Sequence, residues 1–173
     1  MVKDLFRSSA YSPSHDIQLI QIGQQDCMPG HSFGPDSRDF YLLHFVTKGH
    51  GQFRMADRQY ALQQKELFFI PPHLPASYQA DANDPWSYLW IGLNGIILPK
   101  LLAEAGLSPD NPVLCFSQNL LDLLEQVSLS AERNGFDSLQ TLGYLYLFLH
   151  QLTLCGNLQQ ITPPDRMSTW KLP

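Results

Sequence analysis

The chain has 173 residues, of which 44% are hydrophobic and 16% are charged, and its formal net charge is -5. This length suits one domain with a real hydrophobic core and leaves little room for a second full-sized domain. Lys and Arg form no cluster along the sequence, so the chain alone is not expected to bind the phosphate backbone of DNA.

The cysteines, Cys27, Cys115 and Cys155, are odd in number and never form a CxxC pair. This usage argues against both a disulfide framework and a zinc finger. The first residues lack the apolar stretch of a signal peptide, and no segment has enough consecutive apolar residues to cross a bilayer. We therefore expect a soluble, cytoplasmic protein that has no membrane partner.

Residues 1–16 are polar and predict an N-terminal arm, whereas residues 17–95 predict β structure. In the second range, short runs rich in Ile, Val, Phe and Tyr alternate with clusters of Gly, Pro, Asp and Asn. Regularly spaced short strands of this kind favour a jelly-roll sandwich or barrel. The predicted strands cover residues 17–22, 40–47, 51–55, 58–62, 66–70 and 86–93, with a further short strand around 76–81.

After the last predicted strand, the period of the apolar residues changes from two to about 3.6, which predicts helices. The first helix ends near Gly106. The second begins after Ser117 and stops at Asn134 and Gly135, which are good C-terminal signals. The third covers residues 138–155, and Gly156 is expected to end it.

The third predicted helix carries leucines at intervals of three and four residues, the spacing of an a/d seam. This stripe either packs on its own domain or pairs with a second copy across a two-fold axis. We assign residues 96–156 to a helical dimerisation region of a homodimer, and residues 157–173 to a linker or tail. The leucines expected at the dimer contact are Leu142, Leu145, Leu149 and Leu152.

Several features follow one another in a specific order. They are the turn Gly49-His50-Gly51, an apolar strand that runs into Pro71-Pro72, then Tyr78, and finally the run PWSYLWIG, which starts at Pro85. In this order, over roughly residues 17–107, they resemble the N-terminal sensor domain of AraC-type transcription regulators, especially those of sugar-utilisation operons. The chain departs from the usual pattern at Lys65-Glu66 and at Ala76-Ser77, which puts specific ligand contacts in question but not the fold.

The resemblance implies a mainly β fold with C-terminal α structure: a cupin-like jelly-roll β-barrel followed by a helical hairpin that often carries dimer contacts. It also implies a small-molecule sugar effector and a C-terminal pair of helix-turn-helix units. Nothing in these 173 residues matches those units. Contact with DNA is therefore expected only through a C-terminal domain that this sequence does not contain.

A sugar site needs polar side chains for the hydroxyl groups and an aromatic surface for the C–H faces. Alternation along the last predicted strand places Trp86, Tyr88 and Trp90 on one face. If that face points into the barrel, Trp90 can stack on a sugar ring and Tyr88 can offer a hydroxyl group. The alternative is a purely structural aromatic core.

The resemblance adds Arg38 and Tyr78 as candidates, and His31 joins them because it lies in the same loop as Arg38. The predicted ligand-binding residues are therefore His31, Arg38, Tyr78, Tyr88 and Trp90. Arg38 matches the region from which relatives direct an arginine to the ligand, and its rival state is an exposed ion pair with Asp36 or Asp39. For His31 the alternative is a solvated loop residue. For Tyr78 it is core packing.

His44 shares its strand face with Leu42 and Val46, and we expect it to be a core histidine whose hydrogen bonds are satisfied. A cupin metal site needs a His-x-His pair, which does not occur here, so no metal and no cofactor is predicted. The GxSxG, HExxH, P-loop and GxGxxG motifs are also missing, and no catalytic residue is predicted.

These observations favour a sugar-sensing and dimerisation domain of a bacterial AraC-type regulator over an enzyme. The first alternative is a cupin-fold enzyme that acts on a sugar or a small acid, because fold alone does not decide function. The second is a pure dimerisation module whose barrel is filled by its own aromatic side chains.

Overall fold

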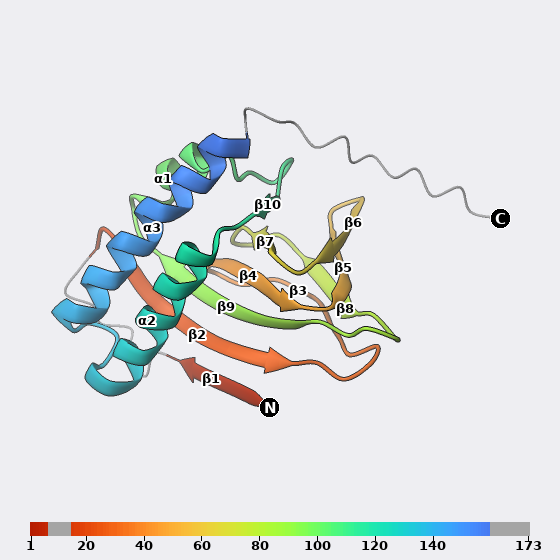
Figure 1. Cartoon of the computed structure of the whole chain (residues 1–173). Coiled ribbons are helices and arrows are strands. Elements are labelled where there is room, and N and C mark those ends of the chain that lie inside the picture. The colour runs from red at the N-terminus through yellow and green to blue at the C-terminus, as the bar shows by residue number, and fades with distance from the viewer. Residues whose placement is uncertain (7–14, 160–173) are drawn as a thin grey trace.

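A computed structural model of the chain describes residues 1–6 and 15–159 (Figure 1). Within them, ten strands form two antiparallel sheets. Sheet A has the order β1 (Val2–Phe6), β2 (Gln18–Asp26), β9 (Ser87–Asn94), β4 (Tyr41–Lys48), β7 (Glu66–Ile70) and β10 (Val113–Cys115). Sheet B has the order β3 (Ser32–Asp36), β8 (Ala76–Ala80), β5 (His50–Met55) and β6 (Arg58–Gln63).

This arrangement confirms the predicted double-sheet β fold with helices at its C-terminal end. All seven predicted strands form, and β7 has the predicted bounds. Three further strands, β1, β3 and β10, were not predicted. Each is short, and each pairs with a predicted strand, namely β2, β8 and β7 respectively.

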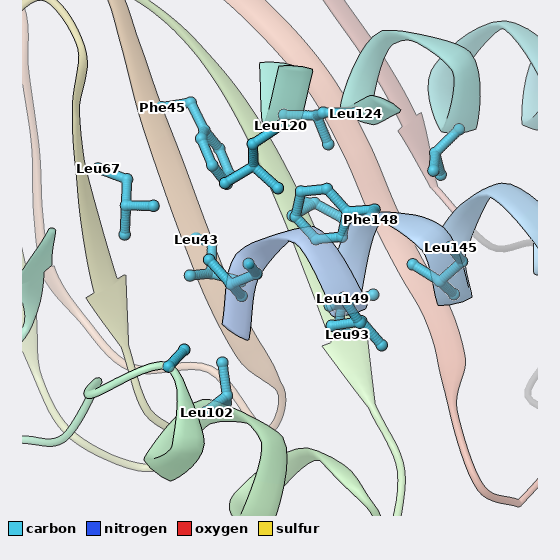
Figure 2. Close-up of a cluster of buried hydrophobic side chains, with 14 of the residues drawn as sticks. Leu43, Phe45, Leu67, Leu93, Leu102, Leu120, Leu124, Leu145, Phe148 and Leu149 are labelled. Carbon is cyan, nitrogen blue, oxygen red and sulfur yellow. The ribbon is translucent and has the colours of Figure 1, made fainter. Parts of the chain in front are cut away.

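Sheet A separates two hydrophobic cores. Along β4, Leu43 and Phe45 point into an outer core that the sheet shares with the helices, while Leu42 and Val46 point into an inner core between the two sheets. Because successive side chains of a strand point to opposite faces, one strand serves both cores. Figure 2 shows the outer core, where Leu43 and Phe45 lie among leucines of the helices.

Three helices cover the outer face of sheet A (Figure 1): α1 (Leu98–Glu104), α2 (Gln118–Asn134) and α3 (Leu139–Gln159). The prediction for α2 is confirmed at both ends. Ser117 is its N-cap and accepts a hydrogen bond from the backbone N–H of Leu120 at 3.3 Å. Gly135 ends it with a positive φ of 86°, a conformation that glycine adopts at little cost.

The predicted C-terminal end of the third helix is wrong, because α3 continues past Gly156 to residue 159. Gly156 instead permits close packing, since a Cβ at this position would overlap the backbone of Ala105. The remainder of the predicted linker, residues 160–173, lies outside the described residues, as do residues 7–14 of the predicted arm. Among the described helices, none is long and apolar enough to cross a membrane.

The leucine stripe of α3 faces inward. Leu145, Leu149 and Leu152 are at most 1% exposed and belong to the outer core, and Leu142 is half-buried (Figure 2 labels Leu145 and Leu149). This burial corrects the assignment of Leu145, Leu149 and Leu152 to a dimer contact, because side chains enclosed by their own chain offer no surface to a partner. For Leu142 the dimer contact stays a prediction. Over residues 139–156, the exposed large apolar residues of α3 are others: Leu139, Tyr146, Leu147 and Leu154.

Candidate ligand-binding site

A cavity of about 180 Å³ lies next to the inner core, between the edge of sheet A and sheet B. Its walls come from β1, β2, β3, β4, β8, β9 and the loops around β3. All five residues that the sequence predicts as ligand contacts line this one cavity. The lining residues are Val2, Asp4, Gln21, Gln25, His31, Phe33, Arg38, Leu42, His44, Tyr78, Tyr88 and Trp90.

Three aromatic side chains, Tyr78, Tyr88 and Trp90, form what we call the aromatic wall. They are between 3% and 9% exposed. The Tyr88 ring meets Trp90 at a centroid distance of 5.9 Å and Tyr78 at 6.0 Å, both edge to face. The predicted alternation of β9 is therefore confirmed, since Trp86, Tyr88 and Trp90 all belong to the inner core.

A glycine on β2 creates the space for Trp90. A Cβ added at Gly23 would overlap the indole ring of Trp90 and the carbonyl oxygen of Lys3 on β1. Burial raises the pKa of Tyr78 and of Tyr88 above the usual phenol value. Both hydroxyl groups therefore stay protonated at neutral pH and can donate hydrogen bonds.

Four polar side chains, Asp4, Gln21, Gln25 and His31, form the polar rim of the cavity. The amide of Gln21 donates to both carboxylate oxygens of Asp4 at 3.0 Å, which links β2 to β1. The amide of Gln25 lies 3.2 Å from Nε2 of His31, and its oxygen accepts from the Tyr88 hydroxyl at 3.4 Å. The rim thus presents donors and acceptors beside the aromatic wall.

Arg38 shows features of both states that the sequence left open, the ligand contact and the ion pair with a neighbouring aspartate. Its guanidinium pairs with Asp36 at 3.4 Å and lies 5.1 Å from the ring centre of Phe33. The same side chain lines the cavity, and its Nε atom is buried without a hydrogen-bond partner in the described part of the chain. Arg38 therefore lines the cavity with one of its donors unpaired.

His44 points inward, as its position on the strand predicts, and it is only 2% exposed. The expectation that its hydrogen bonds are satisfied is wrong, because its Nδ1 atom has no partner among the described residues. Burial, together with the charge of Arg38, lowers the pKa of His44 to about 3. The imidazole is therefore neutral at neutral pH.

Sequence reasoning missed Asp4, Gln21 and Gln25 as cavity residues. A signal existed for the two glutamines, because they lie four positions apart and therefore on one face of β2. For Asp4 the local sequence offered none, since its position at the cavity depends on the pairing of β1 with β2.

Another hollow, of about 490 Å³, lies beside β5 and β6 and includes His50, Glu66 and Asp81. No aromatic side chain lines it. The smaller cavity suits an organic ligand better, because it combines an aromatic wall with several convergent polar groups. In the described part of the chain, no group of three or more His, Cys, Asp or Glu residues is arranged to hold a metal ion.

Comparison with known proteins identifies curated relatives that regulate operons. The chain is 35% identical over 92 residues to the Msm operon regulatory protein of Streptococcus mutans, covering 53% of this chain and 33% of that protein. It is 33% identical over 93 residues to the raffinose operon transcriptional regulatory protein of Pediococcus pentosaceus, covering 52% and 34%. It is 25% identical over 141 residues to the lactose operon transcription activator of Staphylococcus xylosus, covering 79% and 50%.

The chain thus spans between a third and a half of the length of these relatives. Among solved structures, it is similar to the protein YhaK of Escherichia coli, with a TM-score of 0.48 and 14% identity, covering 56% of this chain and 45% of that one. It is also similar to a cupin superfamily protein of Desulfitobacterium hafniense, with a TM-score of 0.40 and 15% identity, covering 54% and 78%.

Residues 18–149 match the model of one protein family, described as the AraC-like ligand binding domain. The match includes both sheets from β2 onward and most of the helical region. It confirms the resemblance seen in the sequence. The chain belongs to the AraC-like ligand binding domain family.

Proposed function

We propose that this chain is the sugar-sensing and dimerisation domain of an AraC-type transcription regulator. The observation that carries the proposal is the meeting of His31, Arg38, Tyr78, Tyr88 and Trp90, from two loops and two strands, around one cavity. The relatives named for the raffinose and lactose operons support a sugar as the effector. DNA is bound through a domain that is not among these 173 residues.

The chemistry of the cavity suits a sugar. The aromatic wall offers flat apolar surface to the C–H faces of a ring, and the polar rim offers donors and acceptors to its hydroxyl groups. At ~30 Å³ for each water in the liquid, the cavity volume corresponds to roughly six waters. This space matches one sugar ring.

Strand β1 links the cavity to the helices, because its two faces have different contacts. Asp4 lines the cavity on one face. On the other face, Lys3 forms an ion pair with Glu132 of α2, and Leu5 packs against the outer core. A ligand that contacts Asp4 therefore changes the stability of a strand that touches α2.

Such a link can regulate DNA binding only if the ligand binds one arrangement of β1, for example the ordered strand, more tightly than another. With a coupling free energy of about 1–3 kcal/mol, binding at one site changes the affinity for the ligand of the other site by roughly 5- to 150-fold. In this proposal the sugar orders β1 over the cavity, and the helical hairpin transmits the change to the DNA-binding domain.

The dimer contact that we propose uses the outer face of α3. Tyr146, Leu147 and Leu154 are 45%, 53% and 40% exposed, and their spacing of one, seven and eight residues places them on one side of the helix. A two-fold axis beside this face would pair the patch with the same patch of a second copy. Sedimentation of the chain over a range of concentrations tests this proposal, and a monomer at every concentration would contradict it.

A thermal-shift screen tests the sensing function, because a ligand that binds the native state raises its apparent stability. The purified chain is heated with neutral mono-, di- and trisaccharides and with sugar phosphates, each with and without a chelator. The proposal predicts that one group of related sugars raises Tm and that the chelator has no effect. No shift with any sugar would favour a pure dimerisation module instead.

A further inference from the structure

Two residues that line the cavity each have a buried polar atom without a hydrogen-bond partner in the described residues: Nε of Arg38 and Nδ1 of His44. Leaving a buried polar atom unpaired costs stability, so native proteins retain few such atoms. Both residues line the same cavity. A polar ligand in that cavity would supply the partners that the protein itself does not.

The His44 ring is held firmly by its neighbours. It stacks on Phe68 with a centroid distance of 4.5 Å and an angle of 3° between the planes. Tyr88 meets it edge to face at 5.0 Å, and Tyr78 lies at 4.8 Å. These contacts fix the plane of the imidazole.

The charged side chains at the cavity balance one another. Apart from the two histidines, the cavity is lined by one acid, Asp4, and one base, Arg38. Because these two charges offset one another, the lining supplies no net charge to compensate an anionic or cationic ligand for its lost hydration. Because burial keeps His44 neutral, its imidazole can donate from one nitrogen and accept at the other, as an alcohol hydroxyl group requires.

We propose that His44 is a ligand-binding residue, and that with Arg38 and Asp4 it selects a neutral, polyhydroxylated ring over its anionic derivatives. The inference rests on the proposed sugar-sensing function and names the residues that decide the class of sugar. One ligand hydroxyl group hydrogen-bonds to the imidazole, and a second oxygen accepts from Nε of Arg38. The aromatic wall covers the apolar face of the same ring.

The test uses the whole chain and measures Kd by calorimetry for glucose, galactose and mannose, and for glucose 6-phosphate and galacturonate. The central variant is His44→Phe, which keeps an aromatic ring and removes both nitrogens. His50→Phe is the matched control, because His50 is an exposed histidine outside the cavity that pairs with Asp84. His44→Gln is a second variant that retains hydrogen-bonding groups.

We expect at least one neutral sugar to bind the wild-type chain at least ten times more tightly than its anionic derivative. His44→Phe should raise the Kd of that sugar by roughly 3- to 10-fold, the effect of one net hydrogen bond. Its Tm should stay equal or rise, because the substitution removes an unpaired polar atom from the core. His44→Gln should bind better than His44→Phe, and His50→Phe should bind like the wild type.

Different results would overturn different claims. An unchanged Kd in folded His44→Phe, or equal binding of neutral and anionic sugars, would refute the inference while leaving the sensing function intact. A large fall in Tm for His44→Phe would identify His44 as a structural residue and would also refute it. If none of the sugars binds the wild-type chain, the proposed function fails together with the inference.

Discussion

Two neighbouring leucines of α3 test which face of the helix is buried. Leu145 is 0% exposed in the outer core, whereas Leu147 is 53% exposed. Leu145→Ala removes a side chain from a closed site, and such substitutions cost about 2–5 kcal/mol. For a chain of this size, that loss lowers Tm by roughly 4–20 °C. Leu147→Ala removes the same atoms from the surface and should change the free energy of unfolding by less than ~0.5 kcal/mol.

Urea unfolding gives the free energies, and sedimentation gives the oligomeric state. Unfolding is measured at two protein concentrations, so that any stability contributed by dimer formation is recognised. Leu147→Ala should weaken self-association, while Leu145→Ala should destabilise the fold at both concentrations. Equal destabilisation by the two variants, or weaker association only for Leu145→Ala, would refute the assignment of the two faces.

Three further predictions concern the cavity, α2 and pH. Gly23→Ala should lower the free energy of unfolding by about 1–3 kcal/mol, because the added methyl group overpacks the site, and it should weaken sugar binding by displacing Trp90. Urea unfolding and calorimetry measure the two effects, and unchanged sugar binding would contradict the prediction. Ser117→Ala removes the N-cap of α2 and should lower the free energy of unfolding, measured in urea, by about 1 kcal/mol. An effect near zero would contradict the capping role of Ser117. The pKa of His44 is about 3 when folded and about 6.5 when unfolded, so the unfolded state binds the extra proton between these values. Stability should therefore fall with pH below about 6.5, by up to ~1.4 kcal/mol per pH unit from this group, and His44→Phe should show a shallower slope in unfolding measured from pH 4 to 7.

The faces of the central strands could be predicted from sequence, because the two cores they separate differ in composition. On β9, Tyr88 and Trp90 alternate with Leu89 and Ile91, and the aromatic residues all turn inward. Alternation is a local property of the chain, so it can be recognised in the sequence without knowledge of the partner strands.

Strand β1 could not be predicted in this way. Its sequence, VKDLF, is short, and its charged residues, Lys3 and Asp4, are typical of an exposed arm. The strand forms because β2 offers an unpaired edge, and that edge exists only after the sheet has assembled. The position of Asp4 at the cavity therefore could not be predicted from the sequence.

The buried face of α3 was also beyond local reasoning. Apolar residues occur on several sides of this helix, so a leucine spacing of three and four does not show which stripe faces inward. Leu145 and Leu149 meet the outer core, and Tyr146 and Leu147 remain at the surface. The choice depends on how α3 packs against α2 and sheet A.

His44 illustrates a similar limit within the site. The strand pattern predicts that its side chain points inward, but hydrogen-bond partners come from residues distant in sequence. Phe68 and Tyr78 surround the ring with aromatic surface, and Nδ1 remains unpaired. An unsatisfied atom of this kind becomes visible only when both sheets are in place.

Hydrogen exchange of the chain with and without the sugar found in the screen tests the central claim most directly, because it locates the ligand and reports on β1 at once. We predict that the sugar slows exchange in β1, β2 and β9 around the cavity, and that protection extends to α2 near Glu132. Identical exchange of β1 in the two states, or protection confined to the hollow beside β5 and β6, would contradict the account.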